Sequence, residues 1–190
     1  MTTIRFTVAD LDLFPQPLDD TRYEVIDGEL FVSHQPHAIH QYLADQFAFA
    51  LNVWDRDTGA GYTISAPGVI FSREDAVAPD VVWFRRERRG EVLGSDGKLH
   101  NAPDIIVEVE SPGAENERRD REVKLDVYSR YGVLEYWLAS YTNQTVRVYR
   151  HQHGALRLVE TLTVRDVLTS PLLPELQLAL DTLFPGPFGR

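Results

Sequence analysis

The segment 102–110 limits what this chain can fold into more than any other part of the sequence. It reads Ala-Pro-Asp-Ile-Ile-Val-Glu-Val-Glu, a short β-branched run whose proline stands only at the entry, where a strand tolerates it. Side chains alternate between the two faces of a strand, so Asp104, Ile106, Glu108 and Glu110 share one face and the three apolar residues between them share the other. The segment therefore predicts a strand with a carboxylate, Glu108, in its otherwise apolar middle.

Glu108 needs a partner, because a glutamate is almost never fully buried unless it is paired or bound to a metal. The alternative is that its face of the sheet is open to water. A similar run at 78–84 places Asp80 directly after Pro79 at the start of another strand. If the two strands are neighbours, Asp80 and Glu108 converge, and two adjacent carboxylates need a cation or a shared proton. Such a pair, with waters and phosphate oxygens, is a candidate site for Mg²⁺ or Mn²⁺.

A helix expected at about 120–131 places a lysine near these acids. Apolar residues follow Lys124 at i+3, i+4 and i+7, so the lysine lies on the apolar, core-facing stripe of this helix. A lysine in that position must either reach the edge of the core or meet a carboxylate. Glu108 and Glu110 are close in sequence, and Asp120, one turn earlier on the same stripe, is a candidate for orienting the lysine.

The other patterns predict more strands than helices. Asp-Gly between two alternating apolar runs predicts a β-hairpin at 23–32, and apolar residues at helical spacing predict a helix at 38–54. Further strands are expected at 62–65, 69–71, 135–139, 145–151 and 156–161. We therefore expect an α+β sheet with helices on its faces and an N-terminal β-hairpin. One domain should span 1–190, with loose ends at 1–20 and 185–190.

Charge limits how this chain can meet nucleic acid. Nineteen basic and 29 acidic residues give a net charge of −10 and a pI of about 5.0, which repels nucleic acid at long range. Contact with DNA then requires a local basic patch, and two arginine clusters are candidates. These are Arg85, Arg86, Arg88 and Arg89 in one loop, and Arg118, Arg119 and Arg121 before the helix at 120–131. The alternative for both clusters is a solvated charged face.

Several other classes of protein are disfavoured. The absence of cysteine excludes disulfides and thiolate metal sites and fits a reducing compartment. The N-terminus lacks a signal-peptide pattern and no apolar run is long enough for a membrane span, so we expect a cytoplasmic protein without a membrane partner. No Gly-x-Ser-x-Gly, Gly-x-Gly-x-x-Gly or phosphate-loop pattern occurs, which disfavours serine hydrolases and nucleotide binders.

The candidate residues also have simpler structural interpretations. Glu108 and Lys124 could form a structural ion pair that perturbs their pKa values without catalysis. Asp104 follows a proline at a strand entry, where an aspartate often caps a turn. The three histidines near the predicted helix start lack the partners of a two-histidine zinc motif, so we interpret them as surface or helix-start residues, with His40 lining the cleft. They are His34, His37 and His40.

Taken together, the motifs resemble those of the Uma-two family, which belongs to the restriction-endonuclease-like, PD-(D/E)xK superfamily. The motifs that carry the resemblance are Tyr23-Glu24, Gly28-Glu29-Leu30, His40, Pro79-Asp80, the run Pro103 to Pro112, Asp120, Lys124, Tyr128, Gly132-Val133, Glu135-Tyr136-Trp137 and Ser170-Pro171-Leu172-Leu173-Pro174. They span most of the chain. The resemblance implies a restriction-endonuclease-like mixed central sheet and a metal-dependent DNA endonuclease acting as a homodimer.

The resemblance also implies roles for individual residues. Asp80 and Glu108 would be the metal-binding acids. The superfamily lysine normally lies two residues after the acid, where this chain has Glu110, so its role would pass to Lys124. Glu110 would bind a second metal, pair with Lys124 or indicate lost activity. An earlier glutamate of the superfamily site corresponds to one of two residues, Glu24 or Glu29.

The sequence thus favours a phosphodiesterase acting on DNA, in which a metal-activated water attacks the phosphate. Asp80 and Glu108 would bind Mg²⁺ or Mn²⁺, and Lys124 would position the water or stabilise charge in the transition state. The alternative is a catalytically weak or inactive interaction module that kept the fold, which the net charge and Glu110 both favour. A third interpretation is a hydrolase of another phosphorylated substrate.

Overall fold

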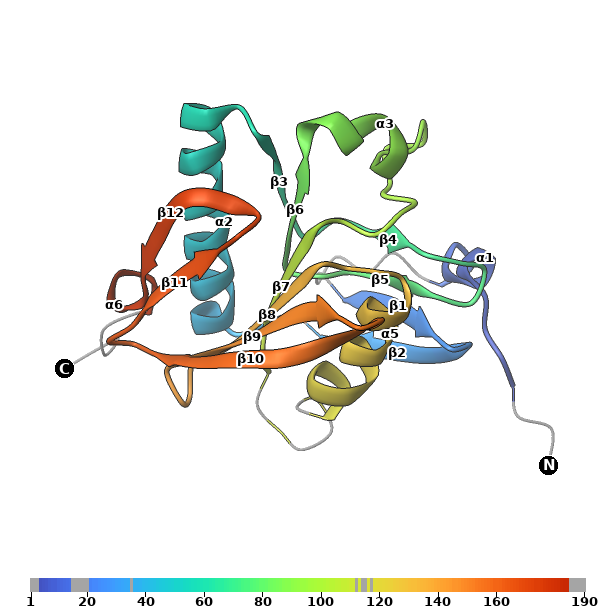
Figure 1. Ribbon diagram of the computed structural model, residues 1–190. Coiled ribbons are helices and arrows are strands. Elements are labelled where there is room, and N and C mark those ends of the chain that lie inside the picture. Colours follow the sequence, from blue (N-terminus) through green and yellow to red (C-terminus); the bar gives the residue numbers. More distant parts are fainter. Residues whose placement is uncertain are drawn as a thin grey trace.

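A six-stranded mixed sheet forms the centre of the computed structural model, which describes residues 4–14, 21–34, 36–111, 113, 116 and 118–184. The strand order is β10-β9-β8-β7-β6-β3, with β7 and β8 parallel and the other neighbours antiparallel (Figure 1). The strands are β3 (Gly61–Ser65), β6 (Val81–Arg85), β7 (Ile105–Val109), β8 (Glu135–Ser140), β9 (Thr145–Gln152) and β10 (Ala155–Thr163). The predicted α+β architecture with a mixed central sheet is confirmed.

The N-terminal hairpin belongs to a second, smaller sheet. β1 (Arg22–Ile26) and β2 (Glu29–Ser33) are antiparallel and joined by Asp27 and Gly28, whose φ angles of 52° and 72° are those that a tight hairpin turn requires. Two short strands, β5 (Ala76–Val77) and β4 (Val69–Ile70), extend this sheet in the order β2-β1-β5-β4. The predicted hairpin is therefore confirmed, and its inner strand packs against the segment that leads to Asp80.

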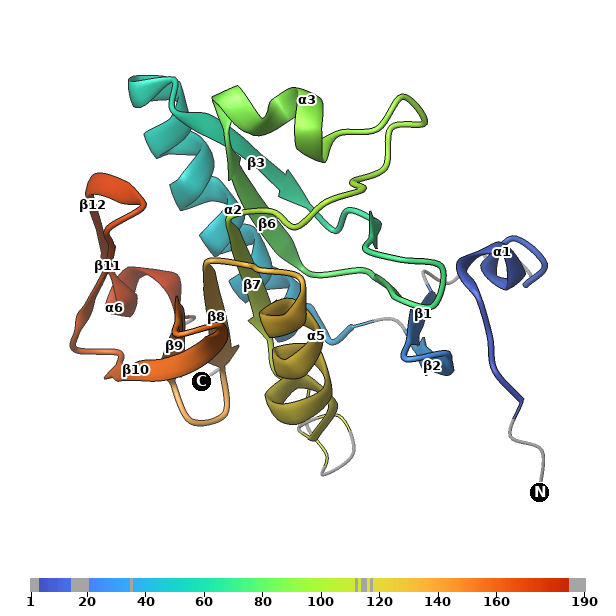
Figure 2. The same cartoon turned by 45° about the vertical axis from the view of Figure 1, so that its right-hand side comes forward.

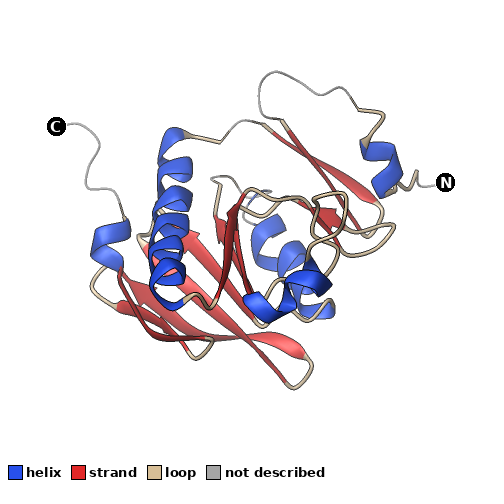
Figure 3. Ribbon diagram, turned by 90° about the horizontal axis from the view of Figure 1, so that it is seen from above, coloured by secondary structure: helices blue, strands red, loops and turns tan. Residues whose placement is uncertain are grey.

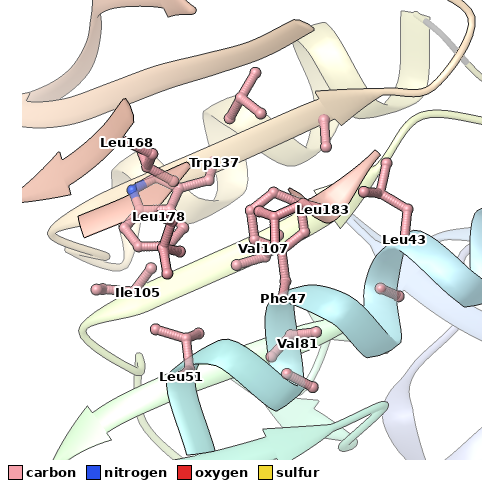
Figure 4. Packing of buried hydrophobic residues seen from close by; sticks show 14 of the residues in the cluster. Leu43, Phe47, Leu51, Val81, Ile105, Val107, Trp137, Leu168, Leu178 and Leu183 are labelled. Carbon is pink, nitrogen blue, oxygen red and sulfur yellow. The ribbon is translucent and has the colours of Figure 1, made fainter. Parts of the chain in front are cut away.

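One face of the main sheet is covered by the long helix α2 (Ala38–Thr58) together with β11 (Val167–Ser170), β12 (Leu173–Ala179) and α6 (Leu180–Leu183). Figure 4 shows the side chains of these elements meeting those of β6, β7 and β8. The labelled residues are Leu43, Phe47, Leu51, Val81, Ile105, Val107, Trp137, Leu168, Leu178 and Leu183. The apolar face predicted for the 102–110 strand is the face that packs on α2.

The opposite face of the main sheet packs against α5 (Lys124–Arg130) and the small sheet, as the turned views show (Figures 2 and 3). Its core contains Ile26, Val82, Phe84, Ile106, Val127, Tyr128, Tyr136 and Leu138. Glu108 points to this face, because it alternates with Val107 and Val109 of the α2 side. Both faces of β7 are therefore covered, and every residue of the strand is buried.

The strand expected at 78–84 is β6, which begins three residues later than expected. β5 ends at Val77 and β6 begins at Val81. Between them, the Ala78 N–H donates to Glu24 Oε1 at 2.8 Å, and Pro79 has no N–H to give to a sheet. The predicted neighbour relation is confirmed, since Val81 pairs with a residue of β7. Asp80 therefore stands at the entry of β6, next to the strand that carries Glu108.

The two predicted helices differ from their expected bounds for local reasons. α2 continues one turn beyond 54 to Thr58 and ends at Gly59, whose φ of 64° lies in the left-handed region. The helix expected at 120–131 begins with a π-helical turn, η2 (Arg119–Val123), before α5. Such turns are rare and often occur at functional sites.

Several elements were not predicted. They are α1 (Val8–Leu11), β5, η1 (Arg86–Arg88), α3 (Arg89–Val92), β11, β12 and α6. Part of the N-terminal segment expected to be loose is anchored, since Phe6 N donates to Gly28 O and Val8 N to Arg73 O, both at 2.8 Å. The remainder of the expected loose ends, residues 1–3, 15–20 and 185–190, lies outside the described residues. Among the described helices, none has the length and apolar character needed to cross a membrane.

Candidate active site

Lys124 lies at the centre of a buried cluster of acids. It is the first residue of α5 and only 3% exposed. Its Nζ donates to Glu108 Oε1 at 2.8 Å and lies 3.1 Å from Glu24 Oε1. Tyr128, one turn later on the same face of the helix, donates its hydroxyl to Glu108 Oε1 at 2.6 Å. Glu108 is 3% exposed, so the expectation that it meets a cation holds and the alternative of a water-exposed face does not.

Asp80 is held by groups from three other elements. Its Oδ1 accepts a hydrogen bond from Arg22 Nη1 of β1 at 2.9 Å. Its Oδ2 accepts the backbone N–H of Val109 in β7 at 2.9 Å and lies 3.4 Å from His40 Nε2 of α2. The Val109 bond fixes Asp80 to the strand that carries Glu108, so the two acids are brought together as their strand pairing predicted.

Glu24 is the N-terminal glutamate that joins this cluster. It is 2% exposed and contacts both Lys124 and the Ala78 N–H, whereas Glu29 is exposed after the hairpin turn. A signal for this choice exists in the sequence. Glu24 stands inside a strand between apolar neighbours, and Glu29 directly follows the Asp-Gly turn, where exposure is the rule. Arg22, which the sequence reasoning missed, lies two residues before Glu24 and so on the same face of β1.

Asp120 lies within the π-helical turn, one turn before Lys124, and is 2% exposed. Its Oδ1 accepts a hydrogen bond from Arg119 Nε at 3.3 Å, and its backbone carbonyl accepts the Tyr136 hydroxyl at 3.0 Å. Arg119 also donates to Ser33 Oγ of β2 at 2.7 Å. The π-helical turn therefore presents an acid and an arginine to the same place, and it ties the hairpin to the helix.

Glu110 lies apart from Lys124. Its carboxylate pairs with the Arg121 guanidinium, and Arg147 Nη1 of β9 lies 3.5 Å from it. Of the roles expected from the sequence, pairing with Lys124 is therefore not what the structure shows. The physical reason is that β7 ends at Val109, so Glu110 lies beyond the strand, where Arg121 of the π-helical turn and Arg147 of β9 are within reach.

The first arginine cluster is occupied by internal contacts. Asp104 Oδ1 lies 3.3 Å from Arg85 Nη1 and 3.0 Å from Arg88 Nη1, and Oδ2 accepts the Arg85 N–H at 2.9 Å. Asp104 is fully buried and fixes this loop, which agrees with the structural role expected for it. Arg86 donates to the carbonyl of the residue that ends α2, and Arg89 is exposed.

The second arginine cluster is divided by the structure. Arg118 is 74% exposed and pairs with Glu122 on the surface, and Arg121 pairs with Glu110. Arg119 is 12% exposed and lines the cavity above the acids. Of the seven arginines predicted to contact DNA, Arg119 is therefore the one that the structure brings to the candidate site.

Burial and like charges govern the protonation of the cluster. Burial raises the pKa of Glu108 to about 8; Lys124 opposes this shift, and Asp80, Asp120 and Glu24 add to it. Burial also raises the pKa of Asp120. Burial favours the neutral form of Lys124, yet Glu108, Glu24 and Asp120 outweigh it and raise the pKa of the lysine above its ordinary value. Lys124 is therefore a permanent cation within an excess of acids.

These side chains meet at the bottom of a cavity of about 240 Å³. Its charged and histidine lining residues are Arg22, Glu24, His34, His37, His40, Asp80, Glu108, Arg119, Asp120 and Lys124. Four carboxylates thus face three permanent cations. His40 is 6% exposed, and its Nδ1 has no hydrogen-bond partner among the described residues. The expectation that His40 lines the cleft is met, whereas His34 and His37 are exposed at its mouth.

The donor set fits a hard divalent cation. Carboxylate oxygens are the ligands that Mg²⁺ and Mn²⁺ prefer, and the raised pKa of Glu108 is that of a carboxyl group with too little positive charge beside it. Within the described residues, no three histidine, aspartate or glutamate side chains already stand in a metal-binding arrangement. The reason is visible in the contacts, because Asp80 is turned toward Arg22 and Glu108 toward Lys124.

A mixed sheet between helices with two strand acids and a lysine at one end is the architecture of a nuclease-like fold. The Uma2 family model, described as "Putative restriction endonuclease", matches residues 9–181, and the chain belongs to this family. This confirms the resemblance seen in the sequence. A solved structure from Anabaena variabilis, described as a "putative nuclease belonging to DUF820", has the same fold, with a TM-score of 0.74 and 19% identity over 94% of this chain and 97% of that one. A search of curated proteins found no match.

Proposed function

We propose that this chain is a metal-dependent endonuclease that hydrolyses phosphodiester bonds in DNA. The family and the fold support a nuclease function. The observation that carries the finer proposal is the convergence of Asp80, Glu108 and Lys124, from three different elements, at the bottom of one cavity. DNA as the substrate is taken from the family description, and the homodimer and the cytoplasmic location remain predictions.

Each residue has a distinct part in this proposal. Asp80 and Glu108 would hold Mg²⁺ or Mn²⁺, which supplies a bound water of lowered pKa and a Lewis acid for the phosphate. Lys124 stays protonated and lies where negative charge on a phosphate would develop, so its role is electrostatic stabilisation. The Tyr128 hydroxyl fixes the orientation of Glu108, and the Val109 N–H fixes that of Asp80.

One observation favours the alternative of an inactive module. Asp80 and Glu108 are each already paired with a cation of the chain, Arg22 and Lys124 respectively. A structural cluster of this kind would have no need of a metal. The two interpretations predict different stabilities for the variants. A structural ion pair loses stability when either Lys124 or Glu108 is removed. A metal site has a surplus of acids, so removing Glu108 does not destabilise the metal-free protein.

The proposal is tested by nicking of plasmid DNA at low salt with Mg²⁺ or Mn²⁺, since phosphate contacts of an acidic protein are easily screened. The variants are Glu108→Gln and Lys124→Met, and Glu29→Gln is the matched control because that glutamate is exposed and outside the cavity. Nicking that requires metal, survives in the control and disappears in both site variants is the expected result. Nicking that persists in Glu108→Gln contradicts the role assigned to Glu108. Absence of nicking by the folded wild type with metal present favours the inactive module.

A further inference from the structure

Arg22 and Arg119 are two cations that the proposed hydrolysis leaves without a role. Both line the cavity, from different walls. Arg22 comes from β1 and is 25% exposed, and Arg119 comes from the π-helical turn and is 12% exposed. Lysines and arginines that only solvate a surface extend into water, whereas these guanidinium groups point inward over a cluster of acids. Their placement calls for an anionic ligand or a purely structural role.

The hydrogen bonds of these two arginines to described residues leave most of their donors unused. A guanidinium group carries five N–H donors. Among the described residues, Arg22 uses one of them, on Asp80, and Arg119 uses two, on Asp120 and Ser33. Both arginines line the cavity, together with Lys124. Guanidinium groups bind phosphate oxygens with two parallel hydrogen bonds, so this arrangement suits a phosphate that enters from the mouth.

The wall that carries Arg22 is fixed in place. Arg22 and Ser33 are opposite each other in the β1–β2 pairing, at the open end of the hairpin. Arg22 is bound to Asp80, and Ser33 accepts a hydrogen bond from Arg119. The hairpin is thereby held against the catalytic acids on one side and the π-helical turn on the other. A ligand that reaches the acids through this cavity therefore passes both arginines.

The depth of this pocket selects the kind of strand that can enter it. Glu24, Asp80, Glu108 and Lys124 are only 2–4% exposed, and about 240 Å³ is smaller than the roughly 300–1,000 Å³ of ordinary small-molecule sites. A duplex also relies on many exposed lysines and arginines for its phosphates, and this chain has a net charge of −10. An unpaired strand can bend its backbone into a pocket, whereas a stacked duplex first pays for unstacking.

We propose that Arg22 and Arg119 form a phosphate-binding pair that holds the backbone of an unpaired nucleic-acid strand above the acids. This deepens the proposed function and rests on it for the identity of the ligand. Lys124 then contacts the reacting phosphate at the bottom of the pocket, and the two arginines hold that phosphate or its neighbour at the mouth. Their own acids, Asp80 and Asp120, keep the guanidinium groups oriented until a strand enters.

The test is fluorescence anisotropy of the full-length chain with a labelled single-stranded oligonucleotide and with the duplex of the same sequence. A Glu108→Gln background with Mg²⁺ prevents hydrolysis during the titration. Arg22→Gln and Arg119→Gln are compared with Arg118→Gln, a matched control that is adjacent in sequence but lies on the surface. Arg22→Lys and Arg119→Lys keep the charge without the two-pronged geometry, and thermal melting shows whether each variant is folded.

We expect the single strand to bind about tenfold more tightly than the duplex. Each glutamine variant should weaken single-strand binding about tenfold and reduce the salt slope of log K by about 0.7 for each lost phosphate contact. The single-strand affinity of each lysine variant should lie between that of the unsubstituted arginine and that of the glutamine variant. The affinity of Arg118→Gln should stay within about twofold of the background protein. Equal affinities of the folded variants and the control, or tighter duplex binding, would overturn the proposal. Nuclease activity is read separately, because a protein that binds single strands through these arginines but never cuts contradicts only the proposed function.

Discussion

Glu108 carries more of the chemistry than any other single residue of the chain. It lies in a strand that is buried along its whole length, accepts hydrogen bonds from Lys124 and Tyr128, and has a pKa raised to about 8 by burial and by three neighbouring acids. A buried charge with this environment costs the folded state free energy. The arrangement is what a site with too few cations of its own would show, and a structural ion pair would not carry the surplus acid.

Glu108→Gln and Lys124→Met should therefore change stability in opposite directions. Glu108→Gln replaces a carboxyl group whose ionised form is disfavoured by burial and by three neighbouring acids, so the free energy of unfolding should stay equal or rise. Lys124→Met leaves buried acids uncompensated and should lower it by about 3–5 kcal/mol. Urea denaturation in metal-free buffer measures both. A loss of similar size in the two variants would instead identify a structural ion pair.

Asp75 differs from Glu108 in having a lowered pKa, and it stabilises the contact between the small sheet and α5. Its Oδ1 accepts the Asp27 N–H at 2.9 Å, and its Oδ2 accepts the hydroxyls of Ser72 and Tyr131 at 2.9 and 2.8 Å. Arg130 Nη2 lies 3.7 Å away. Burial alone would raise the pKa of Asp75, but these partners, the Asp27 N–H first, lower it below the ordinary value of 3.8.

The lowered pKa of Asp75 gives a prediction for acid denaturation. A carboxylate with a lower pKa in the folded state adds stability above its unfolded pKa and loses it as the pH falls through the folded value. The Asp75→Asn variant should be less stable at neutral pH, and its stability should fall less steeply than that of the wild type below about pH 4. Urea titrations at a series of pH values measure this. Parallel acid limbs would show that Asp75 is not a source of the pH dependence.

At the level of secondary structure, two interruptions of regular structure build the site. Residues 78–80 stay outside β6, because the Ala78 N–H bonds to Glu24 and Pro79 has no N–H to give to a sheet. Asp80 follows Pro79 directly and lines the cavity. The helix predicted at 120–131 begins with a π-helical turn, η2, which precedes α5 and brings Asp120 and Arg119 to the same cavity. Regular elements in both places would have turned these side chains elsewhere, so the site depends on the irregular backbone.

The end of α2 also depends on backbone geometry, because its last turn is closed by a glycine. Gly59 has a φ of 64°, and a Cβ there would meet only Arg86 Nη2 at 3.8 Å, so the strain of Gly59→Ala is in the backbone alone. We expect it to lower the free energy of unfolding by about 1–2 kcal/mol. Gly90→Ala in α3 is the matched control. Its Cβ would meet nothing within 4 Å, and it should add about 0.5–1 kcal/mol. Thermal melting of the two variants checks the opposite signs, and equal shifts would contradict this account of the helix end.

Across the whole molecule, sequence patterns predicted the features that depend on residues close together in the chain. Alternation within 102–110 and helical spacing after Lys124 were enough to place the lysine near the acids of this strand, and the structure shows that it bonds to Glu108. The partners of Asp80 were beyond such patterns, because Arg22 is 58 residues away in sequence. The β11–β12 pair was missed; it forms its own two-stranded sheet, and its place in the fold depends on packing against α2 and the main sheet. Contacts of this range depend on how the layers pack, and a single sequence carries little signal for that.

The central claim is that the acids at the bottom of the cavity form a divalent-cation site, and calorimetric titration with Mn²⁺ tests it most directly. The wild type, Asp80→Asn and the exposed control Glu29→Gln are compared in metal-free buffer. We predict binding to the wild type and the control, with affinity at least about tenfold weaker, ~1.4 kcal/mol, in Asp80→Asn. Absence of binding to the folded wild type, or equal binding by Asp80→Asn, would contradict the claim.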